Sequence, residues 1–206
     1  FPAAVAPDNV NVDNDKILLW AKDESKPIEQ YAYQMKHARN FMDRFEAANE
    51  ASTNLKNPAA KAIIEAAIKD TFHVIRSIAL NSYNPSAIDA AMEAQILQIA
   101  GSDKVSTVRE DAINVLSKIN KPIFTPLYEK WVNDSSYTVA GAALAALEIV
   151  DSTKAIAIAK QFSTQPLKKR LNAVVTTILT KYGDVEVFDF VAATYAKLNI
   201  QSSEKF

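Results

Sequence analysis

The chain has 206 residues, of which 49% are hydrophobic and 23% charged, and its formal net charge is −1. This composition is ordinary for a folded domain, and the balanced charge argues against a nucleic-acid binder, which usually carries a basic excess. Only three glycines and no cysteine are present, which excludes Gly-rich phosphate loops, disulfides and thiolate zinc sites. No apolar run approaches the length of a membrane span.

The first predicted element is a short β-hairpin within residues 5–22. Val10 and Val12 alternate with polar residues, and a polar turn is followed by the apolar run from Ile17 to Trp20. A lone two-stranded hairpin is marginal in water, so we expect this one to complete a sheet of an upstream domain. The start at Phe1 without a methionine also indicates a segment of a longer protein.

Beyond Pro27 the periodicity becomes helical, and prolines or short polar turns separate the segments. We assign residues 1–26 to the hairpin and linker and residues 27–206 to one helical-repeat domain. The sequence predicts five helix pairs and a last helix, at residues 28–38 with 40–53, 58–68 with 71–83, 86–100 with 104–119, 123–132 with 136–150, 152–162 with 167–182, and 185–198.

A short pattern recurs in the second helix of each pair. The pattern consists of a large residue, then Arg or a residue that replaces it, and a small or apolar residue four places after the large one. The large residue stands at positions 43, 75, 108, 139 and 171, so the pattern recurs at steps of 31 to 33 residues. A helical period of this length indicates a solenoid, in which each unit buries its apolar face against its neighbours. In the fourth pair the apolar arc is wide, so we expect Ala143, Ala146 and Leu147 to lie in the most buried seam.

An Asp precedes the second helix of two units, and an Arg lies six residues later: Asp70 with Arg76, and Asp103 with Arg109. The Asp can cap the helix, and the Arg can offer a bidentate partner to the Asp of the next unit. This spacing resembles the HEAT-repeat family, in which such residues link adjacent repeats in a ladder. The resemblance implies an all-α fold, a right-handed α-α superhelix of about five HEAT-like helix pairs behind the hairpin, with these four residues at the seams. The ladder is partial, because Ala140 replaces the Arg of the fourth unit.

A second resemblance covers about 40 residues at the N-terminal end. This region is similar to the passage in bacterial aminopeptidase N-type gluzincins where a small β-sandwich ends in a hairpin and the C-terminal helical domain begins. The residues that carry it are Val10 to Trp20, Lys22-Asp23, Glu29-Gln30-Tyr31, Tyr33-Gln34, Ala38-Arg39-Asn40 and Asp43-Arg44-Phe45-Glu46-Ala47.

This resemblance implies a non-catalytic C-terminal domain that gates peptide access to a zinc-containing catalytic domain outside this chain. Its partners would be its own upstream catalytic and β-sandwich domains and the peptide substrates, with no nucleic acid, and such relatives are often periplasmic. The family's chemistry needs a His-Glu-x-x-His helix, a downstream Glu and a Gly-x-Met-Glu-Asn strand, none of which occurs here. The only histidines, His37 and His73, are far apart in sequence, so we expect this sequence to hold no catalytic residue, metal ligand or cofactor.

Two other functions stay open. One is an independent HEAT-repeat scaffold that binds a protein partner; the other is a HEAT-type nucleic-acid enzyme, which the acidic balance disfavours. Four aromatic residues around the first repeat bear on the scaffold hypothesis, because they either pack against the hairpin or form a partner-contact patch. They are Tyr31, Tyr33, Phe41 and Phe45.

Overall fold

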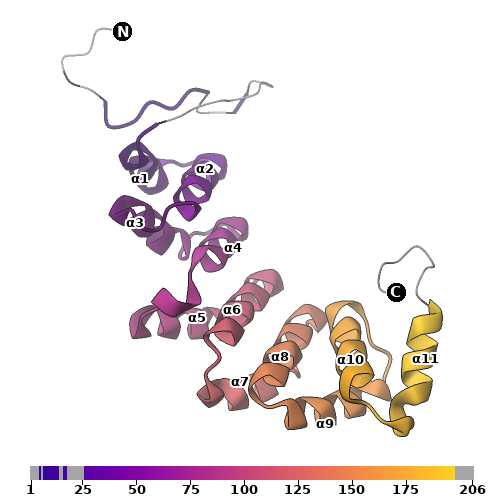
Figure 1. The fold of residues 1–206 in the computed structure, drawn as a ribbon. Coiled ribbons are helices and arrows are strands. Elements are labelled where there is room, and N and C mark those ends of the chain that lie inside the picture. Colours follow the sequence, from indigo (N-terminus) through magenta and orange to yellow (C-terminus); the bar gives the residue numbers. More distant parts are fainter. Residues whose placement is uncertain (1–4, 6, 14–15, 18–25, 198–206) are drawn as a thin grey trace. The chain divides into compact units, whose positions relative to one another are not determined.

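The computed structural model describes residues 5, 7–13, 16–17 and 26–197, and its regular elements are all helical (Figure 1). The all-α prediction is therefore confirmed for the described residues. The α-helices are α1 (Ile28–His37), α2 (Phe41–Ser52), α3 (Pro58–Ala67), α4 (His73–Ser82), α5 (Ala90–Ser102), α6 (Ser106–Ile119), α7 (Thr125–Trp131), α8 (Tyr137–Val150), α9 (Ser152–Ser163), α10 (Lys169–Tyr182) and α11 (Phe188–Lys197).

Three short 3-10 helices occupy places where the sequence predicts the first turn of a longer α-helix. They are η1 (Pro85–Ala87), η2 (Pro122–Phe124) and η3 (Val185–Val187). Both η1 and η2 begin at a proline, which disfavours the helical conformation of the residue before it and so marks the start of the helical segment, and the α-helix follows the 3-10 turn.

The predicted hairpin is not seen, because no strand occurs among the described residues before Pro27. A backbone hydrogen bond of 2.9 Å from Lys16 to Asp13 closes a turn at the predicted place, and both residues have a positive φ of 54°. The valines of this segment are exposed, which leaves strands there without an apolar face to bury. Leu18, Leu19 and Trp20 lie outside the described residues.

The protein divides into two compact units, residues 1–87 and 88–206. In the first unit α1 packs against α2 and α3, and α2 packs against α3 and α4. In the second unit the second helices stack directly on one another: α6 contacts α8, and α8 contacts α10. The first helices α5, α7 and α9 each pack beside the second helix that follows them.

The predicted buried seam is confirmed in α8. Ala143 and Leu147 are completely buried and Ala146 is 1% exposed, because α6, α7, α9 and α10 all contact this helix. At Gly141 the backbone of α10 comes very close to α8. A Cβ at this position would lie only 2.9 Å from the backbone carbonyl carbon of Arg170 and from the backbone nitrogen of Leu171. The small residues of α8 therefore set how near its neighbours can come.

Candidate functional site

Arginines near the start of three second helices fold back over the turn that precedes their own helix. Arg44 Nη1 donates to the carbonyl oxygens of Ala38 and Arg39, six and five residues earlier. Arg76 Nη1 donates to the carbonyls of Asp70 and Thr71 at the same spacing, at 2.8 and 3.1 Å, and Arg109 Nη1 donates to the Asp103 carbonyl at 2.9 Å. The six-residue spacing found in the sequence thus corresponds to a side chain that satisfies backbone carbonyls.

Arg44 and Arg109 each reach a carboxylate of the following helix pair as well. Arg44 Nε lies 2.7 Å from Asp70 Oδ2 and its Nη2 lies 3.1 Å from Oδ1, a bidentate pair in which both side chains are largely buried. Arg109 Nη2 bonds both carboxylate oxygens of Asp134, at 2.9 and 3.2 Å. We call these two contacts the rungs. Sequence reasoning did not name Arg44 and Asp134 as site residues, although both occupy the repeated positions.

The aspartates shape the helix starts differently from a simple N-cap. Asp70, Asp103 and Asp134 each accept the N–H of the residue two places on, at 2.8 to 2.9 Å, which is an Asx turn leading into the helix. At Asp70 burial acts to raise the pKa, but the hydrogen bonds from Arg44 and from the Phe72 N–H outweigh it, so the net pKa is lowered. The hydrogen bond with Asp70 raises the pKa of Arg44 in turn.

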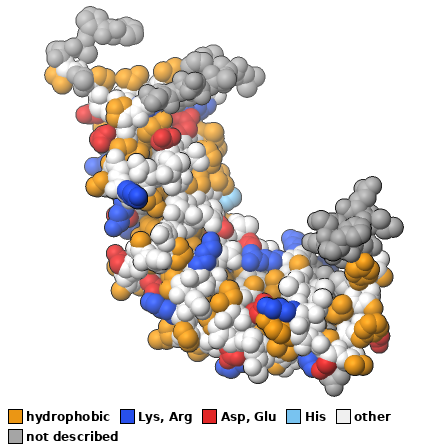
Figure 2. All heavy atoms as spheres, in the orientation of Figure 1, with side chains coloured by type: hydrophobic (Ala, Val, Ile, Leu, Met, Phe, Trp, Pro, Cys, Tyr) orange, Lys and Arg blue, Asp and Glu red, His pale blue; other side chains and the backbone are white. Residues whose placement is uncertain are grey.

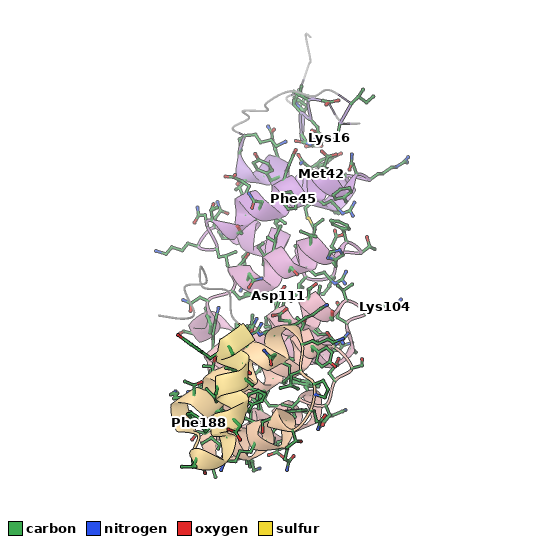
Figure 3. All side chains as sticks on the ribbon, turned by 90° about the vertical axis from the view of Figure 1, so that its right-hand side faces the viewer. Lys16, Met42, Phe45, Lys104, Asp111 and Phe188 are labelled. Carbon is green, nitrogen blue, oxygen red and sulfur yellow. The ribbon has the colours of Figure 1, made fainter. Side chains whose placement is uncertain are left out.

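A second polar cluster joins α1, α2 and the segment before them. Asp43 is fully buried, and its carboxylate lies 2.6 Å from the ammonium of Lys16, which also reaches Glu46 at 3.2 Å (Figure 3). The Lys16 contact is an ion pair rather than a well-directed hydrogen bond. Gln34, itself buried, donates to the Asp43 carbonyl at 2.7 Å and to Glu46, and accepts from Lys26 at 2.6 Å. We call these residues the Asp43 cluster.

The four aromatic residues of the first repeat separate into two environments. Tyr31 is buried, with Lys26 Nζ 4.7 Å from its ring centroid, and Phe45 is partly buried. Tyr33 and Phe41 are each 41% exposed. Tyr33 stacks on His37 at 4.3 Å between ring centroids, and Phe41 packs against Phe72 at 4.5 Å, which in turn contacts His73.

A groove of about 500 Å³ lies along α10 and reaches α11, and sequence reasoning did not predict it. A regular spacing of small and polar residues on one face of 167–182 was the available signal. The residues that line the groove are Lys169, Asn172, Ala173, Thr176, Thr177, Thr180, Lys181 and Thr194.

The described residues contain no group of three or more His, Cys, Asp or Glu placed to hold a metal ion. His37 and His73 instead make the ring contacts described above. Within the same residues, no helix combines the length and apolar character needed to cross a bilayer.

Comparison of the sequence and fold with protein-family models, with curated proteins and with solved structures gave no match. The HEAT-repeat and aminopeptidase resemblances therefore depend on the residues that carry them and on the contacts those residues make.

Proposed function

We propose that this chain is the non-catalytic C-terminal helical domain of a zinc aminopeptidase-like protein, and that it restricts which peptides reach a catalytic domain outside this chain. In this proposal the helix pairs form a right-handed HEAT-like superhelix. The zinc ion and the catalytic residues belong to the other domain, and the helical domain acts by steric exclusion and by the charge of its surface.

One observation carries the proposal: several residues of the aminopeptidase resemblance make hydrogen bonds that hold α1, α2 and the turn between them together. Gln34 bonds Asp43 and Glu46, and Arg44 bonds the carbonyls of Ala38 and Arg39. Asn40, between them, accepts the Met42 N–H and caps α2. These contacts hold α1, α2 and the turn between them in place.

The Asp43 cluster also supports an attachment on the N-terminal side. Lys16 comes from the segment before α1, yet its ammonium neutralises a carboxylate that is only 1% exposed. A buried carboxylate without a cation is costly, so the preceding segment contributes to the stability of the first helix pair. This arrangement suits a helical domain that continues directly from an upstream domain.

The test begins with the gene. A His-Glu-x-x-His motif encoded some hundreds of residues upstream of Phe1 supports the proposal, and its absence refutes it. If the motif is present, the full protein and a version that lacks residues 27–206 are compared on an aminoacyl p-nitroanilide and on a ten-residue peptide. We expect removal of the helices to raise kcat/KM for the peptide relative to the small substrate; unchanged length selectivity contradicts gating.

An independent binding scaffold is the second candidate function. The observation in its favour is the row formed by Phe41, Phe72 and His73, which leaves Phe41 substantially exposed. Exposed aromatic residues are enriched at protein interfaces. A gene that encodes only helical repeats, and whose product loses a partner when Phe41→Ser is introduced, would favour the scaffold.

A further inference from the structure

We infer that the groove along α10 is a docking site for an acidic amphipathic helix of a partner protein. The inference is independent of the aminopeptidase proposal, because it depends only on α10 and α11 of the second unit. The groove volume of about 500 Å³ lies within the range of protein ligand sites.

The groove follows one face of α10 for about three turns. Lys169, Ala173, Thr176 and Thr180 succeed one another at helical spacing, and Lys181 stands at the far end. At 1.5 Å per residue the two lysines are about 18 Å apart along the axis, which is the length of a helix of about 12 residues. The occupant therefore runs along α10 rather than across it.

The chemistry of the floor favours a helix over an extended peptide. The hydroxyls of Thr176 and Thr177 already donate to carbonyls of their own helix, at 2.8 and 2.9 Å. These two hydroxyls consequently offer methyl groups and acceptor oxygens, which leaves the donors that an extended backbone would need to Asn172, Thr180, Thr194 and the lysines at the two ends. A helix satisfies its own backbone, and the small residues Ala173, Thr176 and Thr180 allow it to come close, as α8 and α10 do at Gly141.

The charge of the groove selects an acidic partner. Lysines stand at both ends, and no Asp or Glu is among the described residues that line it. Lys169 is exposed and its ammonium makes no hydrogen bond or ion pair within the described part of the protein, whereas the ammonium of Lys181 pairs with Glu148 at 3.0 Å. Carboxylates near the end at Lys169 should therefore contribute most to binding and to its salt dependence.

Apolar side chains are also exposed on α11 and at the end of α10. Phe188 and Tyr195 of α11 are 67% and 52% exposed, and Tyr182 at the end of α10 is 39% exposed. Figure 2 shows hydrophobic side chains gathered over α11. An amphipathic helix has apolar side chains for Ala173 and the threonine methyl groups of the groove as well as carboxylates for its lysines.

The test selects phage-displayed random 16-residue peptides on the full 206-residue protein and measures binding of the enriched peptides by fluorescence anisotropy. We expect acidic, helix-forming sequences. Thr177→Trp, which fills the groove, should weaken binding at least about tenfold, and Lys169→Glu at least about fivefold at low salt. A proline in the middle of the peptide should abolish binding, because it breaks a helix.

Thr107→Trp and Lys104→Glu are the matched controls, since both residues are exposed in the second unit and neither lines the groove. Lys104 lies well away from Phe188 of α11 in Figure 3. The controls should leave binding within about twofold. Should Thr177→Trp fail to fold, Lys169→Glu decides the question. The inference is overturned if no peptide is enriched, if the enriched peptides are basic, if they tolerate proline, or if the groove variants bind like the controls.

Discussion

Replacing Gly141 by alanine tests the close approach of α8 and α10. A Cβ at residue 141 would lie 2.8 Å from Arg170 Cγ and 2.9 Å from two backbone atoms of Arg170 and Leu171. Side-chain rotation does not relieve the backbone contacts, so α10 itself must move. Overpacking of this kind costs about 1–3 kcal/mol, while alanine gains about 0.5–1 kcal/mol of helix propensity over glycine.

Gly101→Ala separates these two terms. Gly101 lies in α5 of the same unit, and a Cβ there would meet only the Trp131 ring, at 3.8 and 3.9 Å, which is ordinary van der Waals contact. This variant should gain helix propensity without a clash and become more stable by about 0.5 kcal/mol. The difference between the two variants is then the overpacking term alone, about 1–3 kcal/mol, with Gly141→Ala the less stable.

Urea unfolding measured by tryptophan fluorescence gives this difference. Trp131 is buried in the second unit, so a Trp20→Phe background makes the signal specific for that unit. Equal unfolding midpoints for the two glycine variants, at equal m-values, would refute the packing geometry at Gly141.

Three further variants test the polar contacts. Asp70→Asn should lower stability at pH 7 by about 1–3 kcal/mol. Because the pKa of Asp70 is lowered in the fold, this deficit should shrink as pH falls below the unfolded pKa of about 3.9; a deficit independent of pH in urea titrations contradicts the rung with Arg44. Lys16→Met should lower the unfolding free energy by about 3 kcal/mol, because it leaves the Asp43 carboxylate without its cation. Adding Asp43→Asn should recover most of this loss, and calorimetry measures both variants. Burial raises the pKa of the Tyr128 phenol, and its hydroxyl is buried without a hydrogen bond among the described residues. Tyr128→Phe should therefore raise the unfolding free energy by about 1 kcal/mol. A lower unfolding free energy would instead show that the hydroxyl has a hydrogen-bond partner.

The helix pattern is predictable from the sequence because prolines and helical periodicity both act locally. The pattern places the starts of α5 and α7 too early, since η1 and η2 supply a 3-10 turn first. The wide apolar arc of 136–150 correctly identifies α8 as the enclosed helix. By contrast, the apolar run near Ile17 suggests a strand, although no strand forms among the described residues there.

The contacts of the candidate site are predictable where they are local or follow the repeat. The six-residue spacing of Asp103 and Arg109 reports a contact of the Arg with the Asp carbonyl, within one unit. The carboxylate that receives Arg109 belongs to Asp134, 25 residues on, which is the Asp at the repeated position of the next unit. Neither local spacing nor the repeat predicts the contacts of Arg170, whose side chain donates to Glu110 and Asn114, 60 and 56 residues earlier in the chain.

Arg170 connects helices of the second unit at the place where the repeated Arg is missing. Ala140 stands where the next rung after that of Arg109 would need an Arg, and it is followed by Gly141. These small residues leave room for Arg170, whose guanidinium donates to Glu110 and, at 3.0 Å, to Asn114 on α6. Each rung ties a helix pair to the next pair only, whereas Arg170 links α10 to α6 across α8. Since α8 also packs against both helices, we expect the three second helices of this unit to unfold together rather than one at a time.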